Sequence, residues 1–388
     1  MQIVLLGDIA DIQTGPFGSQ LHQEDYVQDG TPIVTVEHLG GDHMTVQNLP
    51  MVSDKDLQRL SKYTLREGDT VFSRVGSVDR ASYVHKEEDG WMFSGRCLRV
   101  RPDNNQVNPR FLSFQLRSPA FTGYIRSIAV GATMPSINTK LLSTAPVKLP
   151  ERKEQDRIAG MLDAIEAKIE LNRKMNETLE QMGQALFRHY FINNPEAEKW
   201  QNGALEGFVK INKESIGKHC VHDQIIYVDI SSVSTGSIDK HETVDSKSAP
   251  SRAKRIVHDG DIIWSTVRPN RRAYSLISNP PENMVVSTGF AVLSPMDDAA
   301  GFVYYLTTSQ AFTDYLTLHA RGAAYPAVAA TDFSNAPTVM PDKDTLREFN
   351  ELVAPNMRLM SELKQEIQTL TTIRDTLLPR LINGKVKL

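Results

Sequence analysis

The segment Leu65–Ser73, LREGDTVFS, returns further along the chain within Ile256–Ser265, IVHDGDIIWS. Both copies place Gly-Asp before two apolar or β-branched residues, a large aromatic residue and a serine. This pattern favours a turn followed by a short β-strand, because glycine supplies a positive φ and aspartate hydrogen-bonds to the turn. The matched glycines, Gly68 and Gly260, lie 192 residues apart, which is the first sign of an internal repeat.

Further matched segments extend the repeat along most of the chain, in the same order and at an offset of 191 or 192 residues. They are Arg80-Ala81 with Arg272-Ala273, Ser118–Tyr124 with Ser309–Tyr315, Gly131 with Gly322, Pro135 with Pro326, and Ala145-Pro146 with Ala336-Pro337. The strand-like Val34–Leu39 and Val228–Val233 match less closely. An ordered series at a nearly constant offset indicates a duplicated domain. The period is too long for a solenoid, so each copy is expected to have its own core.

Within each copy the pattern predicts a mixed α/β domain. Short strands come first, followed by a helix near Pro109–Tyr124 in one copy and Gly301–Tyr315 in the other. A Gly-x-x-x-Pro loop and a last strand, ending at Pro150 or Pro341, complete the unit. The order of the strands does not follow from the pattern.

Each copy is followed by apolar residues that recur at steps of three and four. They predict two long helices, over roughly Glu154–Tyr190 and Asp344–Leu381, with a kink at Pro355 in the second. Apolar stripes of this length need a partner, so we expect an intramolecular antiparallel coiled coil that relates the copies by a pseudo-twofold axis. The residues expected in its seam are Ile158, Leu162, Ile165, Ile169, Asn172, Leu179, Leu186, Phe349, Val353, Met360, Leu363, Ile367, Leu370 and Leu377.

The expected organisation therefore has four parts. Residues 1–150 and 193–342 form the two mixed α/β domains, while 151–192 and 343–388 form the central and the distal long helix. Two domains and a shared coiled coil fit a chain of 388 residues.

The composition excludes several classes of protein. The chain has 47 acidic and 43 basic residues, a formal net charge of −4, which excludes a polybasic binder but not a locally basic surface. Two cysteines are too few for a disulfide framework. Neither a signal peptide nor an apolar run long enough for a membrane span is present, so we expect a cytoplasmic protein without a membrane partner.

A search for catalytic motifs gives none. The chain has no Gly-x4-Gly-Lys-Ser/Thr loop and no Gly-x-Gly-x-x-Gly loop after a strand. The run His219–Asp223 lacks the second ligand pair of a structural zinc site, and we expect a polar loop. Asn279–Glu282 is similar to the Asn-Pro-Pro-aromatic motif of amino-methyltransferases, but a glutamate in fourth place cannot stack on a base, so a turn is expected. We therefore expect no metal and no cofactor on this chain.

Local charge is more informative than net charge. From Arg96 to Lys148 there are eight basic residues and one acidic residue, and from Lys247 to Arg272 seven basic and two acidic. Arginine dominates both segments, which suits bidentate contact with phosphate and with guanine. The alternative for each arginine is a solvated surface side chain. Arginines beside turns, in Arg74–Arg80 and Arg268–Arg272, are the strongest candidates for DNA contact.

Several motifs together resemble those of the specificity (S) subunits of type I restriction–modification enzymes. Gly15–Leu21, GPFGSQL, and Gly30–Ile33, GTPI, are similar to opening motifs of that family. Pro150–Asn172 resembles the entry to its central helix and Leu179–Phe187, LEQMGQALF, the end of that helix. Leu377–Lys385, LLPRLINGK, resembles the end of the distal helix. The second copy departs from the family pattern, because Gly15–Leu21 has no clear counterpart before Val228.

The resemblance implies a non-catalytic DNA-recognition subunit. Each copy would be a target-recognition domain for one half of a bipartite, asymmetric site on double-stranded DNA. The helices would set the half-site spacing and dock two methyltransferase (modification) subunits, which carry S-adenosylmethionine. Restriction subunits would add ATP- and Mg-dependent translocation and cleavage.

On this interpretation we expect base contacts from loops near Gly18–His22, Arg74–Arg80, Gly131–Asn138, Arg268–Arg272 and Gly322–Ala329. The candidate residues are Ser19, Gln20, His22, Arg74, Ser77, Arg80, Arg96, Thr133, Asn138, Arg268, Asn270, Arg271, Arg272 and Tyr325. Two alternatives stay open. One is a coiled-coil scaffold without sequence-specific DNA contact, and the other is an enzyme that modifies DNA unaided, against which the absent cofactor loop argues.

Overall fold

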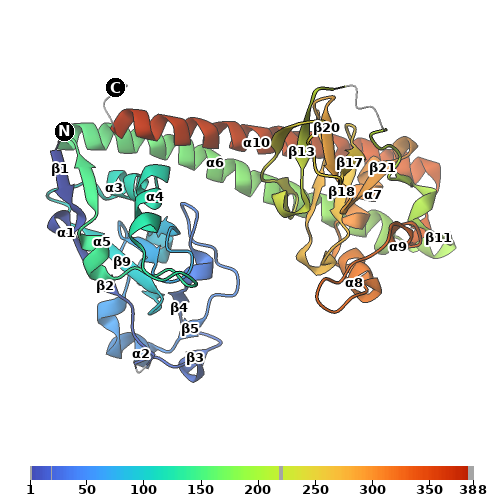
Figure 1. The fold of residues 1–388 in the computed structure, drawn as a ribbon. Coiled ribbons are helices and arrows are strands. Elements are labelled where there is room, and N and C mark those ends of the chain that lie inside the picture. The colour runs from blue at the N-terminus through green and yellow to red at the C-terminus, as the bar shows by residue number, and fades with distance from the viewer. Residues whose placement is uncertain (1, 19, 218–221, 383–388) are drawn as a thin grey trace. The chain divides into compact units, whose positions relative to one another are not determined.

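The computed structural model describes residues 2–18, 20–217 and 222–382 (Figure 1). The chain divides into two compact units, unit 1 from Met1–Glu170 with Gln368–Leu388 and unit 2 from Leu171–Ile367. Both units combine helices and strands, which confirms the mixed α/β class predicted from the sequence. No helix in the described ranges is long and apolar enough to cross a membrane.

Unit 1 is built on two four-stranded sheets. One has the order β2-β9-β6-β7 and is antiparallel, and the other has the order β3-β5-β4-β8, in which β4 and β8 are parallel. A ribbon of β1 and β10 completes the unit. The strands are β1 Gln2–Leu5, β2 Ala10–Thr14, β3 Tyr26–Val27, β4 Thr31–Val34, β5 Met51–Val52, β6 Thr70–Ser73, β7 Ala81–Tyr83, β8 Met92–Phe93, β9 Cys97–Pro102 and β10 Pro146–Leu149. The short helices α1 Leu6–Ile9, α2 Asp54–Arg59 and α5 Thr139–Ser143 connect them.

Unit 2 repeats this plan. Its sheets have the orders β12-β21-β18-β19 and β16-β13-β20-β17, again with one parallel pair, β13 and β20, and a ribbon of β11 and β22. The strands are β11 Gln201–Ala204, β12 Val209–Ile211, β13 Gln224–Val228, β14 Val233–Ser234, β15 Ser237–Ile238, β16 Glu242–Asp245, β17 Ala253–Ile256, β18 Ile262–Ser265, β19 Tyr274–Leu276, β20 Met284–Ser287, β21 Phe290–Pro295 and β22 Pro337–Met340. The repeated Gly-Asp segments thus become β6 and β18, third in equivalent sheets, and all four residues of each strand are buried.

The single helix predicted after the strands is wrong in both copies. Unit 1 has two helices there, α3 Pro109–Leu116 and α4 Pro119–Ile128, and unit 2 has α7 Ala300–Thr307 and α8 Gln310–His319, with α9 Ala330–Ser334 further on. The second helix of each pair begins at a serine cap. The hydroxyl of Ser118 accepts a hydrogen bond from the Phe121 amide, and that of Ser309 from the Phe312 amide.

The long helices are α6 Arg152–Phe187, extended by one π-helical turn over Arg188–Ile192, and α10 Lys343–Ile382, which continues through Pro355. Each is shared between the units. In unit 1 the start of α6 packs with the end of α10, so that Ile158 and Leu378 belong to one buried cluster. In unit 2 the end of α6 packs with the start of α10, where Phe187 lies against Phe349. The pairing is therefore antiparallel within each unit.

The residues expected in the seam differ in burial. Nine are buried: Ile158, Leu162, Ile169, Asn172, Leu179, Phe349, Val353, Met360 and Leu363. Five are half-buried: Ile165, Leu186, Ile367, Leu370 and Leu377. The buried Asn172 donates its amide to Glu366 at 2.8 Å, a polar contact between the two helices that can fix register.

Candidate nucleic-acid interface

Two of the candidate loops of unit 1 lie side by side. The Gly76 amide donates to the Pro135 carbonyl at 2.8 Å, and the Ile137 amide donates to the Arg74 carbonyl at 3.0 Å. The second loop is itself closed by a pair of hydrogen bonds between Val130 and Ser136. Segments 74–80 and 130–138, separate in sequence, therefore form one composite loop surface, here called loop pair 1.

Unit 2 builds the same arrangement from equivalent residues. The Arg268 amide donates to the Pro326 carbonyl at 2.7 Å, and the Val328 amide donates to the Thr266 carbonyl at 2.9 Å. Arg321 and Ala327 close the second loop as Val130 and Ser136 do. Segments 266–272 and 321–329 form loop pair 2. The repeated backbone bonds show that the duplication extends to the loops.

A glycine at the start of each closing loop is required by its backbone. Gly131 has a φ of +110° and Gly322 a φ of +106°, which side chains on L residues rarely adopt. A Cβ on Gly131 would also approach the Met134 carbonyl oxygen to 2.8 Å. The Gly-x-x-x-Pro pattern of the sequence thus encodes the tight return of these loops.

Exposed polar and cationic side chains cover the two loop pairs. In unit 1 Ser77, Arg80 and Thr133 are exposed, as is Arg96 at the start of β9. In unit 2 Asn270 and Arg271 are exposed, and Tyr325 is 70% exposed. Most of the residues predicted to meet DNA in these segments are accessible to it.

Other candidate residues have structural roles. The Asn138 side chain caps α5 by accepting a hydrogen bond from the Leu141 amide at 2.8 Å. Arg272 ties the junction of α7 and α8, because its guanidinium donates to the Thr308 carbonyl at 2.7 Å and to the Gln310 side chain at 2.8 Å. Of the adjacent Arg271 and Arg272, Arg271 is therefore the better candidate for DNA.

The opening motif lies beside loop pair 1. Gln20 is held in place, since its side-chain carbonyl accepts a hydrogen bond from the Tyr63 hydroxyl at 2.8 Å, whereas His22 is exposed. Ser19 lies outside the described residues, as do His219 and Cys220 of the expected polar loop. Phe17, which was not a candidate, is 54% exposed and lies under the guanidinium of Arg74, 5.5 Å from ring centroid to Cζ. Unit 2 has a second arginine on an aromatic ring, Arg268 over Tyr325 at 4.6 Å.

The basic count of segment 96–148 overstates its surface charge. Four of its arginines are partly or wholly buried in ion pairs whose acidic partners come from other parts of the chain. The pairs are Arg99 with Asp11, Arg101 with Asp69, Arg110 with Asp42 and Asp163, and Arg117 with Asp42. For these four arginines the structure therefore shows ion pairs inside the fold, in place of either the DNA contact or the solvated side chain considered from the sequence.

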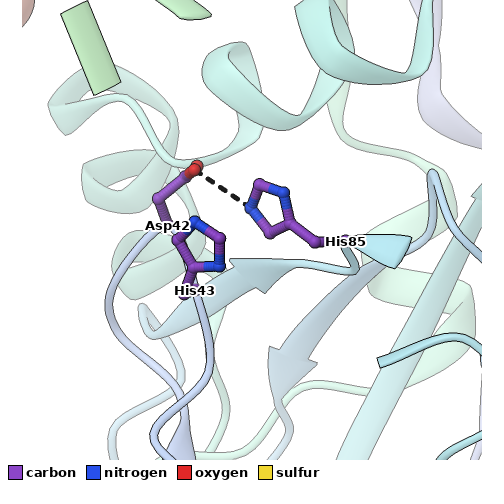
Figure 2. A group of neighbouring side chains, drawn as sticks. All are labelled: Asp42, His43 and His85. Carbon is purple, nitrogen blue, oxygen red and sulfur yellow. Dashed lines mark hydrogen bonds and ion pairs between the residues drawn. The ribbon is translucent and has the colours of Figure 1, made fainter. Parts of the chain in front are cut away.

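The segment's central ion-pair partner, Asp42, forms a compact group with His43 and His85 (Figure 2). Its carboxylate accepts two bonds from Arg110, at 2.6 and 2.8 Å, one from Arg117, and one from His85 at 3.1 Å. Burial alone would raise the pKa of Asp42, but the His85 hydrogen bond and the charges of Arg117 and Arg110 hold it well below its ordinary value.

This group is poorly arranged for a metal ion. Two guanidinium groups on the same carboxylate would repel a divalent cation. The rings of His43 and His85 are stacked, with centroids 3.7 Å and planes 9° apart, so the in-plane lone pairs of their nitrogens do not converge. We assign the group to structure, where it ties the 40–45 loop to α3.

Comparison with known proteins finds a family match for the first part of the chain. Residues 1–181 match the family described as the type I restriction modification DNA specificity domain. The specificity subunit of the type I restriction enzyme HindI from Haemophilus influenzae is 32% identical over 142 residues, which span 36% of this chain and 31% of that protein. Residues 1–181 thus match the type I specificity domain, and the chain is similar to the specificity subunits of type I restriction enzymes.

Two further similar proteins cover more of the chain. The MjaIX specificity subunit of Methanocaldococcus jannaschii is 21% identical over 304 residues, 72% of this chain and 70% of that protein. The crystal structure of a type I restriction–modification S subunit from M. genitalium covers 98% of this chain and 95% of its own, with a TM-score of 0.60 at 15% identity. The second likeness concerns the fold, and it includes the second copy, which lies beyond the family match.

Proposed function

We propose that this chain is a specificity subunit that recognises DNA through loop pairs 1 and 2, each of which binds one half of a split, asymmetric double-stranded sequence. The observation that carries the proposal is that the same paired loops are built twice, with the same backbone bonds but different exposed side chains. Two loop pairs with the same backbone structure and different side chains are suited to two different half-sites. The loop backbone sets where the side chains lie, and the side chains determine which bases they contact.

Contact with phosphate is supported by exposed arginines within the loop pairs. Arg80 and Arg271 extend from the two pairs without the multiple side-chain bonds that hold Arg272. Exposed cations of this kind suit phosphates, which give affinity without sequence information. Sequence would be read by neighbouring side chains such as Ser77, Thr133 and Asn270.

Catalysis would come from partner subunits. In the proposed complex two modification subunits dock on the long helices and supply adenine methylation with S-adenosylmethionine, and restriction subunits add ATP- and Mg-dependent cleavage. Several apolar side chains of α6 are more than a third exposed, and we expect them to take part in that docking. They are Met161, Leu171, Met175 and Met182.

Genome-wide mapping of methyladenine after co-expression with a modification subunit from the same organism tests the proposal. We expect one split, asymmetric motif that is absent from cells lacking this chain. No new methylation, or methylation of a continuous palindrome, would contradict the proposal.

A salt titration of the assembled complex tests the phosphate contacts. Arg271→Ala should weaken binding to all sequences and reduce the slope of log affinity against log salt by about 1, because about one counterion fewer is released. Arg347→Ala, which removes an exposed arginine of α10 paired with Asp344, should leave the slope unchanged. An isotherm that is independent of salt would favour a scaffold that binds only protein.

A further inference from the structure

Arg268 has a backbone conformation that its residue type disfavours. Its φ is +52° and its ψ +61°, in the left-handed region. Among the described residues other than glycine, four more have a positive φ: three are asparagines, which tolerate it, and the fourth is Arg272. The equivalent residue in unit 1, which makes the same bond to a proline carbonyl, is Gly76, with a φ of +79°. Unit 2 thus has an arginine at the position where unit 1 has glycine, the residue type that adopts a positive φ without strain.

The side chain of Arg268 is held in one orientation at that position. Its guanidinium carbon lies 4.6 Å from the centroid of the Tyr325 ring, and its Nη2 donates to the Ala324 carbonyl at 3.1 Å. The ring is 70% exposed, so it does not belong to the core of the unit. Its evident role is to support the guanidinium, and backbone strain kept beside such a contact points to function.

Unit 1 has the same feature built from different positions. Arg74 lies over Phe17, and its Nη1 donates to the Gly95 carbonyl at 3.1 Å. The unit 2 residue that corresponds to Arg74 is Thr266, and the unit 1 residue that corresponds to Tyr325 is Met134. The duplication therefore did not copy this feature from one unit to the other. Each unit has its own arginine fixed on an exposed ring and bonded to a loop carbonyl.

A fixed guanidinium suits a base better than a phosphate. Phosphates accept hydrogen bonds from many directions, so exposed arginines such as Arg80 and Arg271 suit them. Guanine offers two acceptors, O6 and N7, at one place on the major-groove edge, and a planar fork held in advance loses little freedom on binding them. The ring and the carbonyl leave other N–H groups of Arg268 for that contact.

We propose that Arg268 reads a guanine in the half-site of unit 2 and that Arg74 does so in the half-site of unit 1. The proposal rests on the proposed function, because it needs a specific DNA sequence. It adds that each half of that sequence contains a guanine recognised on its major-groove edge through a ring-supported arginine.

Base analogues in the mapped target test it. In the assembled complex, 7-deazaguanine, which lacks N7, is placed at each guanine in turn. At one guanine per half-site the loss of affinity should be about 5- to 100-fold, whereas inosine, which keeps O6 and N7, should bind normally there. Arg268→Ala should remove the sensitivity in the unit 2 half-site alone, and Arg74→Ala in the unit 1 half-site alone.

Two further variants separate recognition from folding. Arg268→Gly restores the residue type of unit 1, so its melting temperature should equal or exceed that of the unmodified chain while discrimination at that guanine is lost. Tyr325→Leu keeps the arginine and removes the ring, and should weaken discrimination, whereas Tyr325→Phe should preserve it.

The outcomes also separate this proposal from the one on which it rests. Specific methylation that is insensitive to 7-deazaguanine at every guanine would overturn this proposal and leave the proposed function intact. If Arg268→Ala weakened binding to all sequences equally, Arg268 would contact phosphate. That result would also overturn the proposal that Arg268 reads a guanine. Absence of any sequence-specific methylation would overturn both.

Discussion

At the residue scale, Asp42 is the carboxylate of unit 1 that binds two arginines and a histidine at once. The residue is 5% exposed. Asp42→Asn should lower the free energy of unfolding by about 3–5 kcal/mol, because it removes the carboxylate that pairs with the buried Arg117 and leaves Arg110 with only the half-exposed Asp163. Urea denaturation measures this loss. The matched control is Asp156→Asn, whose exposed pair with Arg152 should be worth less than about 1 kcal/mol. Equal losses in the two variants would refute the argument.

The same carboxylate should give stability a pH dependence. Because its pKa is lower in the folded than in the unfolded protein, Asp42 stabilises the fold fully above its unfolded pKa of about 4, and the contribution is lost as the pH falls toward the folded value. The difference in unfolding free energy between the unmodified chain and Asp42→Asn should therefore shrink as the pH is lowered below about 4. A difference that stays constant in urea titrations from pH 6 to pH 3 would contradict this.

Single residues also show what the sequence could predict of the site. The candidate loop segments could be named from the sequence, because turn-forming glycine and proline and the arginines beside them are visible there. The roles of Arg271 and Arg272 were not separable, because they depend on whether a carbonyl at Thr308 and an amide at Gln310 lie within reach. Phe17 was missed for the same reason, since its partner Arg74 comes from a segment far along the chain.

At the scale of elements, two glycines of α6 should respond oppositely to the same change. A Cβ at Gly160 would have no neighbour within 4 Å, whereas a Cβ at Gly183 would lie 2.0 Å from the Tyr305 ring. Gly160→Ala should stabilise unit 1 by about 0.5–1 kcal/mol, as alanine does within helices. Gly183→Ala should instead destabilise unit 2 by about 1–3 kcal/mol, because the buried ring must move. Urea midpoints of the two variants decide it, and a stabilising Gly183→Ala would show that the ring is free to shift.

Local pattern explains which elements were predictable. The long helices were predictable because the apolar residues of α6 and α10 recur at steps of three and four within each segment. Strands β6 and β18 were predictable because each follows a Gly-Asp turn. The break between α3 and α4 was missed, although Ser118-Pro119 is a good helix start, because the apolar residues continue across it. Sheet order was beyond reach, since it depends on pairings such as β2 with β9 that join residues 88 apart.

At the scale of the whole molecule, the net charge of −4 and the segment counts both misrepresent the surface. Charge acts where it is exposed, and folding removes Arg99, Arg110 and Arg117 from the surface by pairing them with aspartates from elsewhere. What remains on loop pairs 1 and 2 is a small set of exposed arginines. The internal repeat predicted the candidate loops better than charge did, because two copies of one fold place equivalent loops after equivalent strands.

The repeat in the sequence does not coincide with the units of the structure. Unit 1 requires the end of α10, since Leu378, Leu381 and Ile382 lie in the same buried cluster as its sheet. A chain that ends at Ile367 should therefore lose amide protection in unit 1, where it exposes Ile158 and Leu162, while the core of unit 2 stays protected. Hydrogen exchange read by mass spectrometry resolves the two units. A chain that ends at Ile382 keeps those contacts and should match the full chain. Uniform loss of protection, or none in unit 1, would mean that the distal helix is not part of that core.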